Sequence, residues 1–130
     1  MINGINNKLL EKYKLNKGEN VIELLIKNKL TNLEFMFEYC TKLKNIEELK
    51  YLDTKEVNNF SYMFYNCYKL SDIKGLENWN VSNGNNFSYM FSECSSLLDI
   101  KALENWNVTN GNNFSYIFCD CASLSNIKPL

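Results

Sequence analysis

A 27-residue repeat constrains this chain more than any other feature of its sequence. The clearest copy, residues 59–70, reads N-F-S-Y-M-F-Y-N-C-Y-K-L. The other copies are residues 86–97, 113–124 and, in a worn form, 33–43. One cysteine marks the same place in every copy: Cys40, Cys67, Cys94 and Cys121. A period between about 20 and 50 residues is typical of proteins that stack one unit on the next, so the chain is predicted to fold as such an array.

The first half of each copy carries the apolar spacing of a helix. Phe60, Met63, Phe64 and Cys67 lie at positions i, i+3, i+4 and i+7, and Asn58 or Asn59 stands where an N-cap would accept from free backbone amides. The pattern predicts a short amphipathic helix of two to three turns. Three tyrosines repeat outside this stripe and are expected to stack along its flank with their hydroxyls in water: Tyr62, Tyr89 and Tyr116.

The second half of each copy carries apolar residues at a spacing of three. Leu70, Ile73, Leu76 and Trp79 show it in one copy, and the spacing predicts a tight, curved path that points every third side chain inward. A brief strand around Ile73 and its copy Ile100 is expected to pair with neighbouring repeats. The two tryptophans could form an exposed aromatic strip, but the core or its edge is favoured because Leu52 takes their place in the first repeat.

The repeated asparagines and the Asn-Gly pairs call for a separate interpretation. Asn-Gly favours a hairpin turn, yet Val57 occupies the position of Gly84 and Gly111, and a β-branched residue would be strained at positive φ. A connecting loop is therefore predicted at these places. The asparagines could form a recognition surface, but the favoured interpretation is that their amides satisfy backbone groups in the bends.

Residues 1–32 do not match the repeat and are predicted to form an N-terminal cap, most simply a β-hairpin, whereas residues 33–130 form about four copies with the last one incomplete. The N-terminus lacks the pattern of a signal peptide. No apolar run approaches the roughly 18 residues that span a bilayer, so no membrane insertion is expected.

Composition excludes several function classes. The 14 Lys and Arg are balanced by 15 Asp and Glu, for a net charge of −1, which removes the electrostatic footprint of a nucleic-acid binder. The chain has no histidine, and the pair Cys119 and Cys121 lacks the second pair that a zinc site needs. Four of the five cysteines share one repeat position, which favours a buried ladder of free thiols over disulfides. No catalytic site, metal or cofactor is predicted, and the chain is not expected to be an enzyme.

The repeat resembles the BspA-like class of leucine-rich-repeat proteins. The resemblance covers about residues 33–130 and is carried by W-N-V-S-N, residues 79–83, followed by F-S-Y-M-F at residues 87–91 and then Cys94, with an equivalent run at residues 106–121. It implies a surface or secreted protein linked to adhesion and protein binding. Together with the helix and strand expectations it gives an α+β leucine-rich-repeat solenoid, with a short helix and a short strand or extended segment in each repeat.

The expected function is a non-catalytic interaction or adhesion module for a protein or glycan partner. Stacked-repeat proteins bind through extended surfaces, so positions that differ between copies are the candidates. A structural spacer or a unit that self-associates end to end, without a dedicated ligand, is the alternative. The candidate partner-binding residues are Tyr65, Asn66, Tyr68, Lys69, Ser92, Glu93, Ser95 and Asp120.

Overall fold

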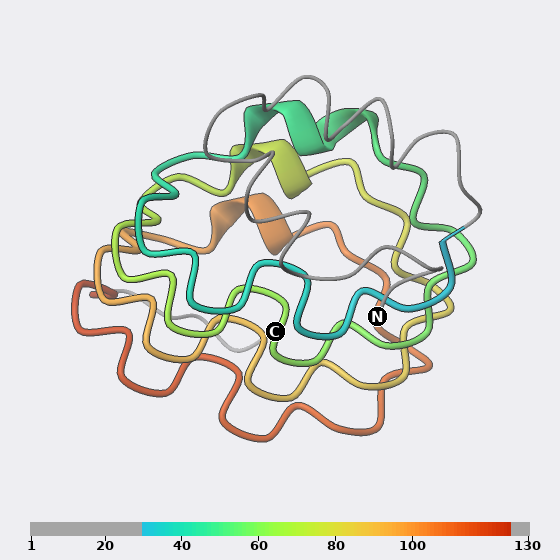
Figure 1. Ribbon diagram of the computed structural model, residues 1–130. Helices are drawn as coiled ribbons and strands as arrows, with labels where there is room; N and C mark the ends of the chain where they lie inside the picture. The colour runs from blue at the N-terminus through green and yellow to red at the C-terminus, as the bar shows by residue number, and fades with distance from the viewer. Residues whose placement is uncertain (1–29, 126–130) are drawn as a thin grey trace.

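The computed structural model describes residues 30–125, over which the chain winds as a stack of coils (Figure 1). Each coil has a motif segment on one side and a return segment on the other. The motif segments are residues 32–43, 59–70, 86–97 and 113–124, and the return segments are residues 44–58, 71–85 and 98–112. Three 3-10 helices lie one above another on the return side: η1 (Glu47–Tyr51), η2 (Lys74–Leu76) and η3 (Lys101–Leu103).

Neighbouring coils pair in parallel, in register with the 27-residue repeat. Isolated parallel bridges join Asn32 to Asn59, Asn59 to Asn86, and Asn86 to Asn113 on the motif side. A further bridge joins Asn45 to Asp72 on the return side. The prediction that the repeats stack is therefore confirmed.

Backbone amides of the motif segment alternate between two kinds of acceptor. Every second amide from Phe60 to Asn66 donates to a carbonyl of the next coil, at 2.8–2.9 Å. The amides of Met63, Tyr65 and Cys67, which lie between them, donate to the carbonyl three residues back, at 3.1–3.3 Å. The segment is thus a run of tight turns, and half of its amide bonds hold the next coil in place.

The predicted amphipathic helix in each copy is wrong. Tyr62 and Asn66 have φ values of 57° and 58°, which no right-handed helix contains. A helix would also direct its amides to carbonyls four residues back in the same segment. The turns point Phe60, Met63, Phe64 and other apolar residues inward at the spacing that a helix would give. The apolar spacing therefore predicted a helix where the chain forms turns.

The predicted strand around Ile73 and Ile100 is also wrong. Each of these residues precedes a 3-10 helix, Ile73 at the start of η2 and Ile100 at the start of η3. The inward spacing by three is confirmed, because Leu70, Ile73 and Leu76 are all buried. Tight 3-10 turns repeat every three residues and so place such side chains on one face.

These corrections overturn the predicted fold class. Residues 30–125 contain no α-helix and no extended strand, only 3-10 turns and isolated bridges. The α+β leucine-rich-repeat solenoid of short helices and strands is therefore wrong for this part of the chain. The predicted N-terminal hairpin cap, residues 1–32, falls almost wholly on residues 1–29, outside the described residues.

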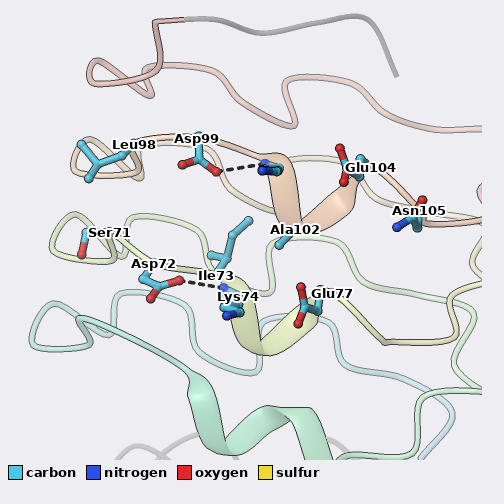
Figure 2. A pocket seen from close by; sticks show the side chains of 11 residues that line it. Ser71, Asp72, Ile73, Lys74, Glu77, Leu98, Asp99, Ala102, Glu104 and Asn105 are labelled. Carbon is cyan, nitrogen blue, oxygen red and sulfur yellow. Dashed lines mark hydrogen bonds between the residues drawn. The ribbon is translucent and has the colours of Figure 1, made fainter.

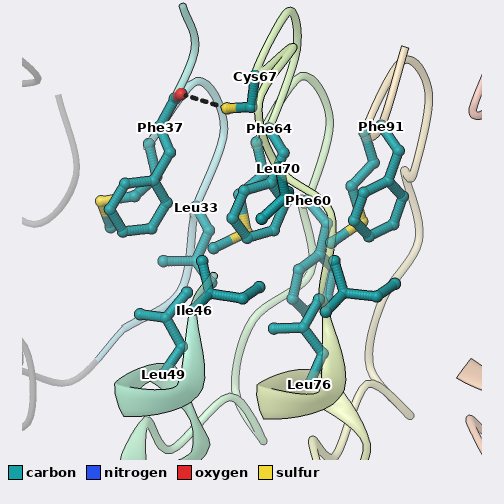
Figure 3. Packing of buried hydrophobic residues seen from close by; sticks show 14 of the residues in the cluster. Leu33, Phe37, Ile46, Leu49, Phe60, Phe64, Cys67, Leu70, Leu76 and Phe91 are labelled. Atoms are coloured by element: carbon teal, nitrogen blue, oxygen red, sulfur yellow. Dashed lines mark hydrogen bonds between the residues drawn. The ribbon is translucent and has the colours of Figure 1, made fainter. Parts of the chain in front are cut away.

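The core consists of columns of identical or similar side chains, one from each coil (Figure 3). Phe37, Phe64 and Phe91 stack at centroid distances of 5.6 and 5.5 Å, and Phe91 lies 5.8 Å from Phe118. Such offset stacking stabilises aromatic pairs beyond the area that they bury. Every coil therefore supplies one layer of core to both of its neighbours.

The cysteine ladder is confirmed. All five cysteines are free thiols, and those at the repeat position are buried. Cys67 Sγ donates to the Phe37 carbonyl at 3.1 Å, and Cys94 Sγ donates to the Phe64 carbonyl at 3.2 Å. Each thiol therefore satisfies a carbonyl of the preceding coil while it packs as a small apolar side chain.

Tryptophan and asparagine side chains also join coils. Trp79 is buried and its Nε1 donates to the Leu49 carbonyl at 2.8 Å, which confirms the core position. Asn59 Oδ1 accepts from the Ser61 amide at 2.9 Å, and Asn83 Nδ2 donates to the Lys55 carbonyl at 2.6 Å. The asparagine side chains satisfy backbone groups in the bends, as predicted.

Candidate functional site

The outward surface of the motif segments is shaped by residues in the left-handed backbone conformation. Eight non-glycine residues have φ between 57° and 62°, two in each motif segment. That conformation costs an ordinary residue roughly 1–2 kcal/mol. In the first three motif segments, the amides of these left-handed residues donate to carbonyls of the next coil, and these hydrogen bonds offset the conformational cost. The eight residues form two columns across the coils, Phe35, Tyr62, Tyr89 and Tyr116 in one, and Tyr39, Asn66, Glu93 and Asp120 in the other.

The first column is a continuous aromatic ladder. Its ring centroids are 5.0 Å apart between Phe35 and Tyr62, 4.6 Å between Tyr62 and Tyr89, and 5.0 Å between Tyr89 and Tyr116. The predicted stacking of the three tyrosines along the flank of the repeat is confirmed.

Two further tyrosines widen the ladder into a face. Tyr65 packs edge-on against Tyr39 at 5.4 Å and against Tyr62 at 5.4 Å. Tyr39 and Tyr116, at opposite ends, keep 50% and 62% of their surface exposed. We call this set the aromatic face: Phe35, Tyr39, Tyr62, Tyr65, Tyr89 and Tyr116.

Carboxylates border the aromatic face, and lysines do not. Glu38 shares a repeat position with Tyr65, while Glu93 and Asp120 share one with Tyr39. No Lys or Arg occurs in residues 32–40, 59–67, 86–94 or 113–121. We call this set the face carboxylates: Glu38, Glu93 and Asp120.

One hydrogen bond ties the rings to the carboxylates. The Tyr65 hydroxyl donates to Glu93 Oε1 at 3.1 Å, and this bond raises the pKa of Tyr65 to about 12. Burial and the neighbouring Tyr62 and Tyr116 raise the pKa of Tyr89. Burial also raises the pKa of Glu38. The phenols of Tyr65 and Tyr89 thus stay protonated at neutral pH and can donate or accept hydrogen bonds.

The structure divides the eight candidate residues into three groups. Tyr65, Asn66, Glu93 and Asp120 lie on or beside the aromatic face. Ser92 is buried and therefore not available to a partner. The other three, Tyr68, Lys69 and Ser95, lie at the next corner of the coil. There Lys69 is exposed, and Ser95 Oγ donates to the Tyr68 carbonyl at 3.4 Å.

Sequence reasoning missed the residues that make the face continuous. Phe35, Tyr62, Tyr89 and Tyr116 are not among the candidates, because positions that repeat are assigned to the scaffold. Tyr39 shares the variable position of Asn66 but belongs to the worn first copy, which the comparison of variable positions leaves out. One signal was available: the tyrosines repeat outside the apolar stripe, so burial alone does not account for them. A repeated position can serve both the stack and its surface.

A groove lies on the return side, between η2 and η3 (Figure 2). It is an open groove of about 620 Å³ lined by residues of both signs, among them Glu77 and Glu104. Its two aspartates each accept a backbone hydrogen bond, Asp72 from Lys74 at 2.8 Å and Asp99 from Lys101 at 3.0 Å. Those carboxylates hold the turns into η2 and η3, so they serve the fold first.

The chemistry available in the described part is limited. The chain has no histidine, and residues 30–125 contain no group of three or more Cys, Asp or Glu that could hold a metal ion. Burial raises the pKa of the half-exposed Cys119, and its neighbour Asp120 raises it further, so its nucleophilic thiolate is disfavoured. Among the same residues, no helix is long and apolar enough to cross a membrane.

Comparison with known proteins gives one match. No curated protein and no solved structure matches the chain. The family described as "Mycoplasma protein of unknown function, DUF285" matches residues 8–128, which is nearly the whole sequence. The repeat region and most of the preceding segment thus fall within one family match, and the chain belongs to the DUF285 family.

Proposed function

We propose that this protein is a non-catalytic interaction module that binds a protein or glycan through its aromatic face. One observation carries the proposal: aromatic rings in contact run without a gap across all four motif segments, and the end rings Tyr39 and Tyr116 are half exposed or more. Tyrosine is enriched among residues that dominate binding energy, because it adds a large contact area at little entropy cost.

Two further observations support the proposal. The backbone under the face is fixed by hydrogen bonds to the next coil, so the surface is organised before a partner arrives. The sequence also resembles BspA-like proteins, which are linked to adhesion at cell surfaces. A cell-surface or secreted location and the absence of catalysis are parts of the same proposal.

A binding screen with matched variants tests it. The full chain would be applied to an array of extracellular proteins and glycans, beside the variant Tyr65→Ser/Tyr116→Ser. We expect at least one ligand whose apparent affinity falls tenfold or more in this variant, because both rings lie on the face. The control Tyr68→Ser/Leu98→Ser removes two exposed apolar side chains elsewhere and should leave that ligand bound.

Other results of the screen would count against the proposal. If no ligand on the array binds, or if every ligand is lost equally with the control variant, the aromatic face is not the binding surface. Circular dichroism and thermal melting of all three proteins would establish that the substitutions leave the stack folded.

End-to-end self-association is a second candidate, favoured by the last described coil. In the earlier coils, four amides of each motif segment donate to the next coil. In the last described coil, the four equivalent amides donate to no described residue: those of Phe114, Tyr116, Phe118 and Asp120. Its apolar residues Phe114, Ile117 and Phe118 are half-buried, and their counterparts are fully buried. Three carbonyls of the first described coil accept from no described residue: those of Asn32, Glu34 and Met36. On a second copy of the chain, these carbonyls could accept from the four open amides.

Light scattering over a wide concentration range tests this second candidate. The expected result is an average mass that rises with concentration and a variant Ile117→Lys that stays monomeric, since a lysine on the open layer would be buried without a partner. Leu98→Lys, at an exposed site on the return side, should associate as the parent chain does. A parent chain that remains monomeric at every concentration excludes end-to-end association.

A further inference from the structure

The two ends of the aromatic face differ from its middle. Inside the ladder each ring is covered by the rings above and below, so mainly edges and hydroxyls face outward. Tyr116 has only Tyr89 stacked against it among the described residues, and Tyr39 meets Tyr65 edge-on at 82°. Both end rings therefore present a free π surface, which agrees with their exposures of 62% and 50%.

Each free ring shares its motif segment with a carboxylate. Glu38 directly precedes Tyr39, and Asp120 stands at the repeat position of Tyr39 in the same motif segment as Tyr116. An aromatic surface beside a carboxylate attracts an organic cation, since the ring quadrupole and the negative charge act in the same direction. Arginine occurs in such contacts more often than lysine does.

The face carboxylates are not neutralised by the chain itself. The two ion pairs within residues 30–125 join Lys50 to Glu47 and Lys55 to Asp53, all on the return side. Burial raises the pKa of Glu38, because its carboxylate has lost part of its hydration. No ion pair with a described lysine compensates for that loss. A cationic partner would supply that missing charge.

The separation of the two ends gives the length of the partner. Tyr39 and Tyr116 stand three coils apart, which is about 14 Å at roughly 4.8 Å per parallel layer. The centroid distances of 5.4, 6.3 and 5.0 Å that link them through Tyr65 and Tyr89 place these two end rings at most about 17 Å apart. An extended peptide advances about 3.3 Å per residue and turns side chains i and i+4 to the same side, roughly 13 Å apart. The phenol hydroxyls between the ends are placed to bond to the backbone of such a strand.

We propose that the aromatic face binds an extended polypeptide segment that carries two arginines four positions apart, one at Tyr39 and Glu38 and the other at Tyr116 and Asp120. This inference rests on the proposed function and adds the chemistry of the partner. The tyrosine ladder between the two cation sites acts as a ruler, so the spacing of the arginines is selected together with their charge.

Synthetic peptides test the inference directly. The probe is the fluorescein-labelled peptide G-S-R-G-S-G-R-S-G, and its affinity for the full chain would be measured by fluorescence anisotropy at physiological salt. We expect binding at least tenfold tighter than that of G-S-R-R-G-S-G-S-G, which has the same charge at another spacing. A version with glutamate in place of both arginines should not bind.

Matched protein variants separate the two cation sites from general electrostatics. Glu38→Gln and Asp120→Asn each remove one carboxylate at one end, and each should weaken the probe at least fivefold. Tyr39→Ser and Tyr116→Ser should do the same through loss of the ring. Glu104→Gln makes the same change of charge in the groove of the return side and should leave affinity unchanged.

The outcomes distinguish this inference from the proposed function. Equal affinity for the two arginine spacings, an equal loss with Glu104→Gln, or no binding of the probe would each overturn the two-arginine partner. If the array screen still finds a ligand that depends on Tyr65 and Tyr116, the aromatic face remains a binding surface for another chemistry. If neither experiment gives a face-dependent ligand, both proposals fail.

Discussion

Replacement of Phe64 by alanine is expected to lower the free energy of unfolding by about 3–5 kcal/mol. Phe64 is fully buried and stacks on Phe37 at 5.6 Å and on Phe91 at 5.5 Å. The substitution therefore leaves a cavity and removes the ring contacts to both neighbouring coils. Urea denaturation of the two proteins, followed by circular dichroism, measures the difference.

The chain offers a matched control for this prediction. Phe118 stands in the same column but in the last described coil, where it is half-buried and, among residues 30–125, stacks on Phe91 alone. Phe118→Ala should therefore cost clearly less than Phe64→Ala. Equal losses for the two substitutions would mean that the column does not transmit stability from coil to coil.

The buried thiols are expected to make the fold sensitive to alkaline pH. Burial raises the pKa of Cys94 to about 12 and that of Cys121 to about 11, from an ordinary value near 9. A hydrogen bond with Cys40, and then burial, raise the pKa of Cys67 as well. A thiol whose pKa is raised by folding contributes stability that is complete below the unfolded pKa and is lost as pH rises toward the folded one.

The loss should therefore fall between about pH 9 and pH 12, at up to about 1.4 kcal/mol per pH unit for each such thiol. Cys94→Ala removes one of them, so its free energy of unfolding should decline less steeply over this range than that of the parent chain. Urea denaturation under reducing conditions at several pH values gives both slopes, and the ionisation of tyrosines is common to the two proteins.

A control thiol completes this experiment. Cys119 is half-exposed and lies outside the ladder, so Cys119→Ala should change the slope less than Cys94→Ala does. If Cys94→Ala leaves the decline in the free energy of unfolding above pH 9 unchanged, the thiol of Cys94 is not buried away from water as the structure indicates.

The sequence was sufficient to predict the buried apolar residues of the repeat and how the copies relate. The 27-residue register, the thiol ladder, the inward spacing by three after Leu70 and the flank of stacked tyrosines all follow from side-chain chemistry repeated at fixed intervals. These features depend on which residues face the core, and the core selects for apolar type and size.

The local backbone could not be predicted in the same way. Tight turns with left-handed residues at Tyr62 and Asn66 bring Phe60 and Phe64 inward at a spacing of four, as a helix does. Tyrosine and glutamate are not typical of positive φ, so residues such as Tyr62 and Glu93 gave no signal of it. The conformation is stabilised by amides that bond to residues 26 positions away, which a local pattern cannot report.

The candidate site was predicted only in part, for a related reason. Variation between copies pointed to Tyr65, Glu93 and Asp120, which do lie on or beside the aromatic face. It also pointed to Ser92, because a small residue at a variable position gives no sign of burial. The ladder tyrosines needed the three-dimensional register, since their exposure depends on which coil lies beside them.

The hydrogen bonds between coils also give the stack an electrical polarity. Twelve backbone bonds of the motif segments run from an amide of one coil to a carbonyl of the following coil, whereas six bonds, on the return side and where it meets the motif side, run the other way. The peptide dipoles of the larger set add along the axis, so a net polarity remains. Antiparallel pairing would largely cancel them. The amide-bearing end of the stack therefore carries a partial positive charge, and the side chain of Asp120 lies at that end. An anionic residue there is favoured by the same dipoles that its own backbone helps to create.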